Sequence, residues 1–240
     1  TVPVSVSWQG TPPVKSPPAL KTTGYQAERQ GPAELSDNPQ YAAFTLQSDI
    51  YKIVVLAEKW IVTFNPAKSE SLVVTRRRQR HYPDLCMYNQ LIPFVTEHKH
   101  LGLYLTNDCS WHSHISYVSN KAWKRVHILR KLKFSFDRKS LDIIYTTFIR
   151  PILEYGDIIW SNLTAKDSQQ LELIQNECAR IVSGATKLAS INKLLEEVGW
   201  ESLSARRRKH RLIMFYKMQN GLSPNYISAL VPMPNSIPRY

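Results

Sequence analysis

Apolar residues recur at helical spacing from Thr45 to Phe64, and this stripe predicts the first long helix of the chain. Thr45 or Ser48 could cap its amino-terminal end, because a hydroxyl oxygen there accepts a hydrogen bond from a free backbone N–H. The dipeptide Asn65-Pro66 should end the helix, since a residue that precedes proline is disfavoured in the α region.

Shorter runs follow in which apolar and polar residues alternate, as they do in strands with one buried face. Asn89 separates two of these runs and suggests a hairpin turn. In the last run Leu101, Leu103 and Leu105 fall on one face. We therefore predict a small antiparallel sheet over about residues 71–105. Its runs are Ser71–Arg77, Leu85–Tyr88, Gln90–Val95 and Lys99–Leu105.

The pattern becomes helical again beyond this sheet. Ser110 is a candidate N-cap for a helix whose apolar stripe extends from Trp111 to Leu132. Asp137 could cap a second helix, which Pro151 should kink or interrupt. The predicted fold class is therefore α+β, predominantly helical, with a sheet followed by a helical bundle. Three further helices are predicted. One starts at Asp167 with Gly184 at its C′ position, one extends from Ser190 to Val198 and is closed by Gly199, and one extends from Ser202 to Asn220 and is closed by Gly221.

Proline sets the two ends of the chain apart from its middle. Residues 1–40 hold seven of the fifteen prolines, and proline lacks a backbone donor, so no regular strand ladder is expected there. We expect residues 1–44 to form an extended, poorly ordered leader and residues 223–240 to form an irregular tail. The region that contains the first helix and the sheet then covers residues 45–107, and the helical region covers residues 108–222.

The charge balance favours a polyanionic partner. The 240 residues contain 31 Lys and Arg against 19 Asp and Glu, which gives a net charge of +12 and a pI near 9.6. Nucleic acid and anionic lipid are the partners that such a charge favours, and a merely soluble basic protein is the alternative. No apolar run approaches the roughly 18 residues that a membrane-spanning helix needs, so no membrane partner is expected.

Basic residues concentrate between positions 99 and 150, where ten Lys and Arg stand against three Asp, a net of +7. Lys121, Lys124 and Arg125 lie at positions i, i+3 and i+4 of a predicted helix and so share one of its faces. That face could follow the phosphates of a duplex backbone, or it could be an ordinary solvated face.

A second basic cluster lies in the last long predicted helix and consists of Arg206, Arg207, Arg208, Lys209 and Arg211; its candidate binding residues are Arg206, Arg207 and Arg208. The arginine fork suits bidentate contacts with phosphate, so we predict that these residues bind nucleic acid. Nuclear import is an alternative, because short basic runs also serve as import signals.

The cysteines and histidines suggest an intracellular protein without a metal site. The three cysteines, Cys86, Cys109 and Cys178, are widely spaced, and no signal peptide is present. Both observations fit a reducing compartment, so we expect a nuclear or cytoplasmic protein rather than a secreted one. No ligand pair stands at a familiar metal spacing, so no metal ligands are predicted. The histidines that could suggest a metal site are His98, His100, His112 and His114.

Three motifs in a fixed order carry a resemblance to a known family. They are Trp60-Ile-Val-Thr-Phe-Asn-Pro-Ala-Lys68-Ser-Glu70, His98-Lys-His-Leu-Gly102 and Trp111-His-Ser-His-Ile115. Their order resembles the reverse transcriptases of non-LTR (LINE-type) retrotransposons from motif D onward, and the resemblance covers about residues 46–230. It implies that residues 45–107 are a remnant of the polymerase palm and that residues 108–222 are the thumb and the region after it.

The resemblance also implies roles for individual residues. Lys68 stands at the position of the motif D lysine, which lies near the incoming nucleotide; an ordinary solvated lysine after a turn is the alternative. Lys99, His100 and Gly102 stand at the primer grip, motif E. There Gly102 would let a primer strand approach the backbone, and Lys99 would pair with a phosphate. The alternative for this segment is an ordinary strand with a bulge at Gly102.

The family's Tyr-X-Asp-Asp box is absent, because no two aspartates are adjacent anywhere in the chain. Two-metal phosphoryl transfer needs clustered carboxylates, so we expect this chain to bind no cofactor, and Mg²⁺ belongs only to an intact parent enzyme. The resemblance thus implies a partial RNA-directed DNA polymerase that is inactive alone and lacks its upstream polymerase domain. The chain begins with Thr1 rather than Met, which suggests a fragment or an incompletely predicted gene product.

The partner implied by the resemblance is an RNA–DNA duplex or RNA, held through phosphate contacts. Two alternatives stay open. The chain could be a repurposed basic module that binds nucleic acid or protein without enzymatic activity, or it could be a relic without function.

Overall fold

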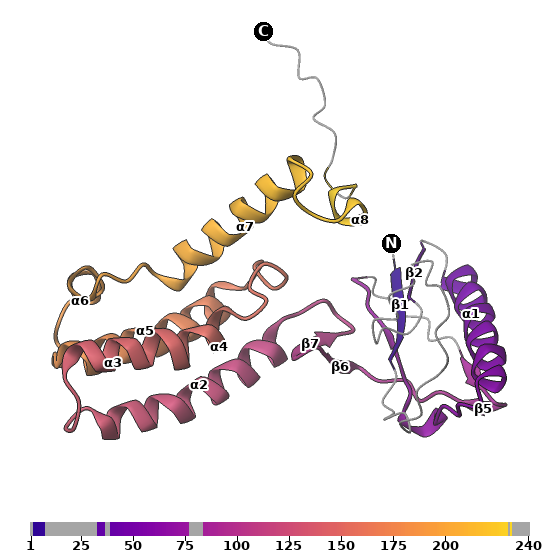
Figure 1. The fold of residues 1–240 in the computed structure, drawn as a ribbon, viewed down its shortest axis with the longest axis horizontal. Coiled ribbons are helices and arrows are strands. Elements are labelled where there is room, and N and C mark those ends of the chain that lie inside the picture. The colour runs from indigo at the N-terminus through magenta and orange to yellow at the C-terminus, as the bar shows by residue number, and fades with distance from the viewer. Residues whose placement is uncertain (1, 8–32, 37–38, 77–83, 230, 232–240) are drawn as a thin grey trace, which may run out of the picture. The chain divides into compact units, whose positions relative to one another are not determined.

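The computed structural model describes residues 2–7, 33–36, 39–76, 84–229 and 231 (Figure 1). The fold is α+β and predominantly helical, as predicted. The chain divides into two compact units, Thr1–Ser113 and His114–Tyr240, each of which is described by itself.

The first unit contains a three-stranded antiparallel sheet. Its central strand is β1 (Val2–Ser7), which pairs with β2 (Ala33–Ser36) on one side and with β3 (Glu70–Val73) on the other. The prediction that no regular ladder forms in residues 1–40 was wrong for β1 and β2, because valine alternates with other residues in β1 and makes a strand despite Pro3. Residues 8–32 and 37–38 of the predicted leader lie outside the described residues, and residues 39–44, also assigned to that leader, belong to a helix instead.

Two hairpins follow β3 in place of a single continuous sheet. In the first, β4 (Cys86–Met87) pairs with β5 (Gln90–Leu91) through a turn at Tyr88 and Asn89, whose φ angles are 50° and 59°. Two consecutive positive φ angles are typical of a type I′ hairpin turn. The predicted turn at Asn89 is therefore confirmed, although the strands beside it are shorter than predicted.

The second hairpin corrects the prediction for Lys99–Leu105. Instead of one strand, the chain forms β6 (Glu97–His100) and β7 (Leu103–Thr106), which pair antiparallel. The reversal lies at Leu101 and Gly102, with φ angles of 45° and 86°. Alternating leucines fit one strand as well as two, so the local pattern did not reveal this turn.

Helix α1 (Pro39–Lys59) begins and ends earlier than predicted. Thr45 and Ser48 lie inside it rather than at its N-cap. The chain leaves the helix at Ile61, where φ is 56°, before it reaches Asn65. Asn65 instead caps a short 3-10 turn, η1 (Pro66–Lys68), because its Oδ1 accepts a hydrogen bond of 2.9 Å from the backbone N–H of Ala67.

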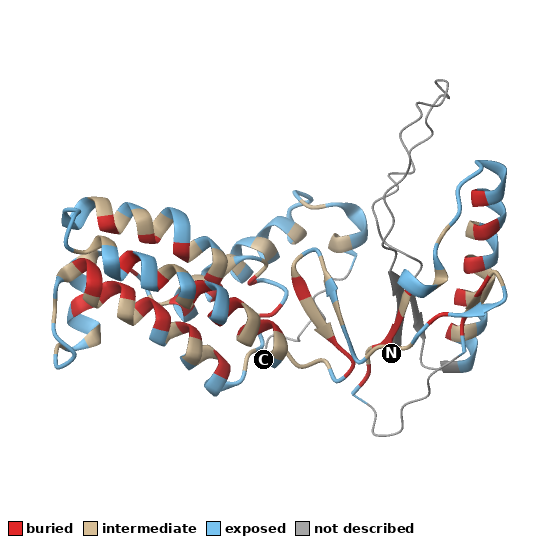
Figure 2. Ribbon diagram, turned by 90° about the horizontal axis from the view of Figure 1, so that it is seen from below, coloured by how far each residue is buried: buried red, intermediate tan, exposed pale blue. Residues whose placement is uncertain are grey.

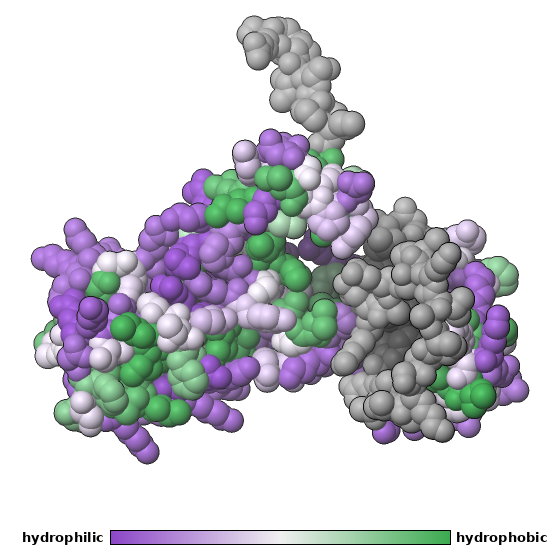
Figure 3. Space-filling view, viewed as in Figure 1, coloured by the Kyte–Doolittle hydropathy of each residue, from purple (hydrophilic) through white to green (hydrophobic). Residues whose placement is uncertain are grey.

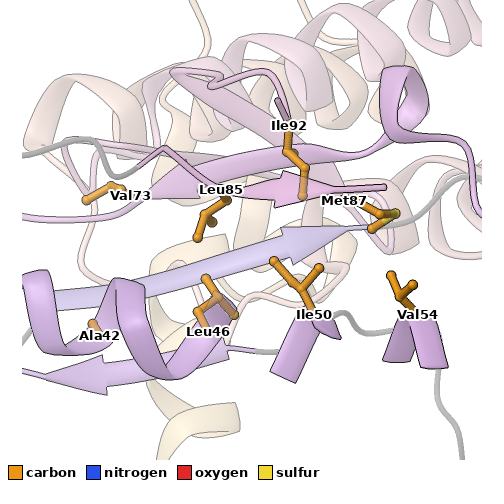
Figure 4. Packing of buried hydrophobic residues seen from close by; sticks show 8 residues of the cluster. All are labelled: Ala42, Leu46, Ile50, Val54, Val73, Leu85, Met87 and Ile92. Atoms are coloured by element: carbon orange, nitrogen blue, oxygen red, sulfur yellow. The ribbon is translucent and has the colours of Figure 1, made fainter. Parts of the chain in front are cut away.

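One side of α1 packs onto the strands and forms the core of the first unit. Figure 4 shows Leu46, Ile50 and Val54 facing the side on which Leu85 and Met87 lie. A side-chain amide reinforces this contact: Gln47 donates to the carbonyl of Cys86 and accepts from its N–H, both at 2.8 Å. The amide of Gln47 thus pairs with both the N–H and the carbonyl of Cys86, as the backbone of a neighbouring strand would.

The other side of α1 is exposed and apolar. Buried residues follow the side of the helix that faces the strands, and exposed residues follow the opposite side (Figure 2). An exposed apolar stripe of this length is typical of a surface that another protein segment covers. Its members are Tyr41, Phe44, Tyr51 and Val55.

Helices α2 (His112–Leu132) and α5 (Ala165–Ser183) are the longest in the described part of the second unit. The predicted apolar stripe of α2 is buried from Ile115 to Leu129, which confirms that helix. Helix α5 begins at the N-cap Thr164, three residues before the predicted start, because Thr164 and Asp167 cap it together. Thr164 Oγ1 accepts from the Asp167 N–H at 3.1 Å and donates to the Asp167 carboxylate at 2.7 Å.

A π-helical turn just before Pro151 interrupts the α-helical pattern that begins after Asp137, which agrees with the predicted irregularity at this proline. Asp137 is the N-cap of α3 (Arg138–Ile144), because its Oδ1 accepts a hydrogen bond of 3.1 Å from the Ser140 N–H. Helix α3 continues into a π-helical turn, η2 (Tyr145–Ile149), and then into α4 (Arg150–Glu154). Proline cannot donate a backbone hydrogen bond and its ring crowds the carbonyl four residues earlier. The wider π turn just before Pro151 relieves that crowding, since the Arg150 N–H donates to the carbonyl of Tyr145.

The described part of the second unit contains three more helices: α6 (Ile191–Val198), α7 (Leu203–Gln219) and α8 (Asn225–Ser228). The first two are confirmed within one residue of their predicted ends; Gly199 follows α6 with a φ of 71°, and Ser202 caps α7. The one-turn α8 lies in the predicted tail and was not expected. None of the helices drawn from the described residues combines the length and the apolar character that crossing a membrane requires.

A buried set of polar contacts joins η2, α5 and the segment before α7. The hydroxyl of Tyr145 donates to Gln175 Oε1 at 2.6 Å, and Gln175 Nε2 donates to the backbone carbonyl of Glu201 at 3.0 Å. The ring of Tyr145 also stacks on Trp200, with centroids 3.9 Å apart. Trp200 in turn donates its indole N–H to Asp142 at 2.8 Å. Burial raises the pKa of Tyr145 well above its usual value, so the hydroxyl remains a donor.

The substitution Tyr145→Phe tests this set of contacts. It removes one hydroxyl and leaves Gln175 Oε1 buried without its donor, so the free energy of unfolding should fall by about 1–3 kcal/mol. Urea unfolding followed by circular dichroism measures the change. Tyr226→Phe is the matched control, since Tyr226 is 74% exposed and its replacement should change stability by less than about 0.5 kcal/mol. Equal stability of the two variants would contradict the role given to Tyr145.

Candidate nucleic-acid interface

Three exposed lysines lie along one face of α2. Lys121 and Lys124 are exposed on the side of the helix opposite its buried stripe. Lys131 lies two turns beyond Lys124, is also exposed, and extends the same face. It is absent from the predicted site residues, although its i+7 spacing from Lys124 could have identified it. Helix α2 contains no Asp or Glu, so nothing within the helix neutralises this lysine face.

The arginines of α2 have structural contacts instead. Arg125, predicted to share the face of the two lysines, turns toward η2: its Nη1 donates to the Phe148 carbonyl at 2.5 Å, and its guanidinium lies 3.9 Å from the centre of the Phe148 ring. Arg130 donates to Glu177 on α5 at 2.8 Å. These two arginines flank the buried stripe and attach α2 to its neighbours, so the outward positive charge of α2 comes from lysine.

The β6–β7 hairpin carries the predicted primer-grip residues. Lys99 is exposed on β6, and its Nζ lies 5.4 Å from the centre of the Tyr104 ring. Gly102 lies at the tip of the hairpin, so it is a turn residue rather than a bulge in a strand. His100 is half-buried next to His98, with ring centroids 6.2 Å apart. Lys99 and Gly102 thus share one small hairpin.

Lys68 ends the 3-10 turn η1 and is exposed. The carboxylate of Glu70, two residues later, contacts His98 Nδ1 at 2.8 Å and joins β3 to β6. In the part of the chain that the structure describes, no three His, Cys, Asp or Glu side chains converge to hold a metal ion. The described residues near Lys68 therefore do not fit the two-metal centre of a polymerase, which needs several clustered carboxylates.

The histidines that invited comparison with metal ligands have separate surroundings. His98 pairs with Glu70 in the first unit. His114 is buried in the second unit, where its ring lies 5.6 Å from that of Trp160. Burial lowers the pKa of His114 to about 4, so the ring is neutral at physiological pH and packs as part of the core.

The three consecutive arginines of α7, Arg206, Arg207 and Arg208, differ sharply in their surroundings. Arg206 forms a two-bond ion pair with Glu154 at the end of α4, and this contact raises the pKa of Arg206. Arg207 is buried, and burial lowers its pKa. Arg208 is exposed. Hydrophilic side chains gather over the amino-terminal half of α7 and apolar ones over its carboxyl-terminal half (Figure 3).

Comparisons with known proteins give one relationship. Over 146 residues, 60% of this chain, it is 25% identical to the probable RNA-directed DNA polymerase from transposon X-element of Drosophila melanogaster. The matched part is 16% of that polymerase, so the chain spans a small part of its relative. No protein-family model and no solved structure matches the chain. The chain is thus distantly related to a retrotransposon reverse transcriptase.

The substitutions Arg206→Gln and Arg208→Gln test whether Arg206 stabilises the fold and the exposed Arg208 does not. Removal of the Arg206 guanidinium leaves the largely buried carboxylate of Glu154 without its two hydrogen bonds, so the free energy of unfolding should fall by about 1–3 kcal/mol. Arg208→Gln should change it by less than about 0.5 kcal/mol. Urea unfolding of both variants provides the measurement, and an equal decrease in the two would refute the assignment.

Proposed function

We propose that this chain is the palm and thumb portion of a non-LTR (LINE-type) retrotransposon reverse transcriptase that holds an RNA–DNA duplex or RNA by its phosphates without polymerising. The observation that carries the proposal is the acid-free lysine face of α2 in a chain related to a transposon polymerase. The net charge of +12 supports it, because a strongly basic protein attracts polyanions.

The spacing of the lysine face suits a phosphate backbone. Lys121 and Lys131 are ten residues apart, and a helix rises about 1.5 Å per residue, so the face is roughly 15 Å long. Phosphates of one strand recur at about 3.4 Å along the axis of a duplex. Flexible lysine side chains on such a face can reach several successive phosphates without reading a base, and this contact is independent of sequence.

The β6–β7 hairpin is proposed to contact the primer strand. Lys99 offers a point charge on its surface, and Gly102 at its tip lets a strand approach the backbone closely. Lys68 is proposed to contact the incoming nucleotide only in an assembled polymerase. The absence of adjacent aspartates from the chain supports a role in holding nucleic acid rather than in catalysis.

The exposed apolar stripe of α1 is a candidate contact surface for a further segment of the polymerase. Phe44 is 76% exposed and Val55 is 65% exposed on the side that faces away from the strands. Covering such side chains stabilises a complex by about 25 cal/mol for each Å² of apolar surface removed from water. We propose that the upstream part of the polymerase palm covers this stripe.

The double variant Lys121→Gln/Lys124→Gln tests the lysine face. Its affinity for an RNA–DNA hybrid of about 20 base pairs should be weaker than that of the unaltered chain. The log–log slope of affinity against salt should also decrease in magnitude, by about 0.9 for each phosphate that the variant no longer touches. Fluorescence anisotropy between about 50 and 200 mM salt measures both quantities.

The matched control is Lys187→Gln/Lys193→Gln, which removes the same charge from exposed positions outside α2. It should leave the slope unchanged. An equal effect of the two double variants would show that net charge alone attracts the hybrid. Absence of binding by the unaltered chain at about 50 mM salt would refute the proposal and favour a protein-binding module or a relic.

Primer extension tests the statement on catalysis. The purified chain, given a primed RNA template, the four deoxynucleotides and Mg²⁺ or Mn²⁺, should add no nucleotide, because the sequence lacks the adjacent aspartates that the family uses for two-metal transfer. An intact reverse transcriptase serves as the positive control. Template-dependent extension that Lys68→Gln abolishes would contradict the proposal directly.

A further inference from the structure

A basic cavity of about 650 Å³ lies between α7 and the beginning of α5. Its volume falls within the range of roughly 300–1,000 Å³ that is typical of ligand sites. Four of the residues that line it are basic, four are serines and none is acidic. The cavity thus offers cationic groups and hydroxyl donors together, which is the chemistry that an anion needs.

Arg207 is the buried cation of this cavity. It is only 5% exposed, its Nη2 donates to Ser168 Oγ at 2.7 Å, and its guanidinium lies 5.8 Å from the centre of the Trp160 ring. Its Nη1 is buried and has no hydrogen-bond partner among the described residues. A buried donor without an acceptor is costly, and for a charged group the cost is higher.

Arg208, the residue after Arg207, and Arg211, one helical turn further along α7, complete the basic lining. Arg208 is exposed, and Arg211 Nη1 lies 3.5 Å from Ser161 Oγ, at the limit of hydrogen bonding. The fourth basic residue, Lys209, is neutralised by Glu201 at 2.7 and 2.9 Å. The positive charge available to a ligand therefore comes from the three guanidinium groups.

The carboxylates close to Arg207 have other partners. Glu172 accepts hydrogen bonds from the Leu203 and Ser204 N–H groups at the start of α7. Glu154 pairs with Arg206, and Asp157 contacts His210 Nδ1 at 2.6 Å. None of these contacts supplies an acceptor to Arg207 Nη1, so an acceptor from outside the chain would complete the site.

We propose that this cavity binds a phosphate group, which accepts a hydrogen bond from Arg207 Nη1 and is held at the rim by Arg208 and Arg211. Phosphate fits better than a carboxylate, because its several oxygens can accept from three guanidinium groups and nearby serine hydroxyls at once. The group could come from the backbone of a nucleic-acid strand, in which case the inference rests on the proposed function. It could also come from a small phosphate monoester, in which case it stands alone.

Thermal unfolding of the full chain in inorganic phosphate tests the site itself. At equal ionic strength, about 20 mM phosphate should raise the Tm relative to chloride by about 2–4 °C, because the anion binds only the folded chain. Arg208→Gln/Arg211→Gln should abolish most of that shift. The control Lys187→Gln/Lys193→Gln should keep it. No shift, or an equal shift in both double variants, would overturn the proposal.

Replacing Ser168 provides a second test that does not depend on removing an arginine. In Ser168→Asp a carboxylate beside Arg207 takes the place of the ligand, so the Tm should rise without phosphate and the response to phosphate should vanish. The isosteric neutral variant Ser168→Asn should keep the response. A full response to phosphate in Ser168→Asp would contradict the site.

Two further ligands, a short single-stranded RNA and adenosine monophosphate, distinguish a backbone phosphate from a small phosphate monoester. If Arg208→Gln/Arg211→Gln weakens RNA binding severalfold more than the control does, the cavity holds a backbone phosphate. If the monophosphate raises the Tm as inorganic phosphate does and RNA binding is unchanged, the ligand is a small monoester. If the chain binds neither RNA nor hybrid but still responds to phosphate through these residues, the proposed function fails and this site remains.

Discussion

The hydrogen bonds of Gln175 hold the helical unit together. Its side-chain amide accepts from Tyr145 and donates to the backbone of Glu201, so one buried residue of α5 joins the π turn before Pro151 to the segment that leads into α7. Because Gln175 is fully buried, each of these bonds must form, or a polar group would remain unpaired in the core. The position at which α7 begins therefore depends in part on this amide, and the surroundings of Arg206 and Arg207 near the start of α7 depend on that position.

That dependence explains why the basic residues take different roles. Once α7 begins beside α4 and α5, Arg206 meets Glu154 and Arg207 enters the interior against Trp160 and Ser168. Arg125 is likewise held by Phe148 of the π turn. These three guanidinium groups thus join elements to one another, and the cations left outward on α2 are lysines. Arginine suits the buried contacts because its planar fork makes several hydrogen bonds at once.

Local patterns predicted the helices well and the strands less well. The apolar stripe of α2, the Asp137 cap and the Gly199 stop depend on residues within a few positions of each other, and all three were recognised. Strand β1 was missed because it is stable only through pairing with β2 and β3, which lie far along the chain. The partners of Arg125, Arg206 and Arg207 are 23, 52 and 39 residues away, so no spacing rule could distinguish these arginines from exposed ones.

The lysine face and the cavity differ in how water and salt reach them. Exposed lysines bind phosphates by releasing counterions, so their contribution decreases steeply as salt increases. The guanidinium of Arg207, in a residue only 5% exposed, lies in a medium of lower dielectric, where an opposite charge interacts more strongly and mobile ions screen less. A strand held at both places would therefore leave α2 first as salt rises and stay bound to Arg207. In the proposed complex the lysine face would provide general attraction to polyanions, and the cavity would hold one phosphate at a fixed place.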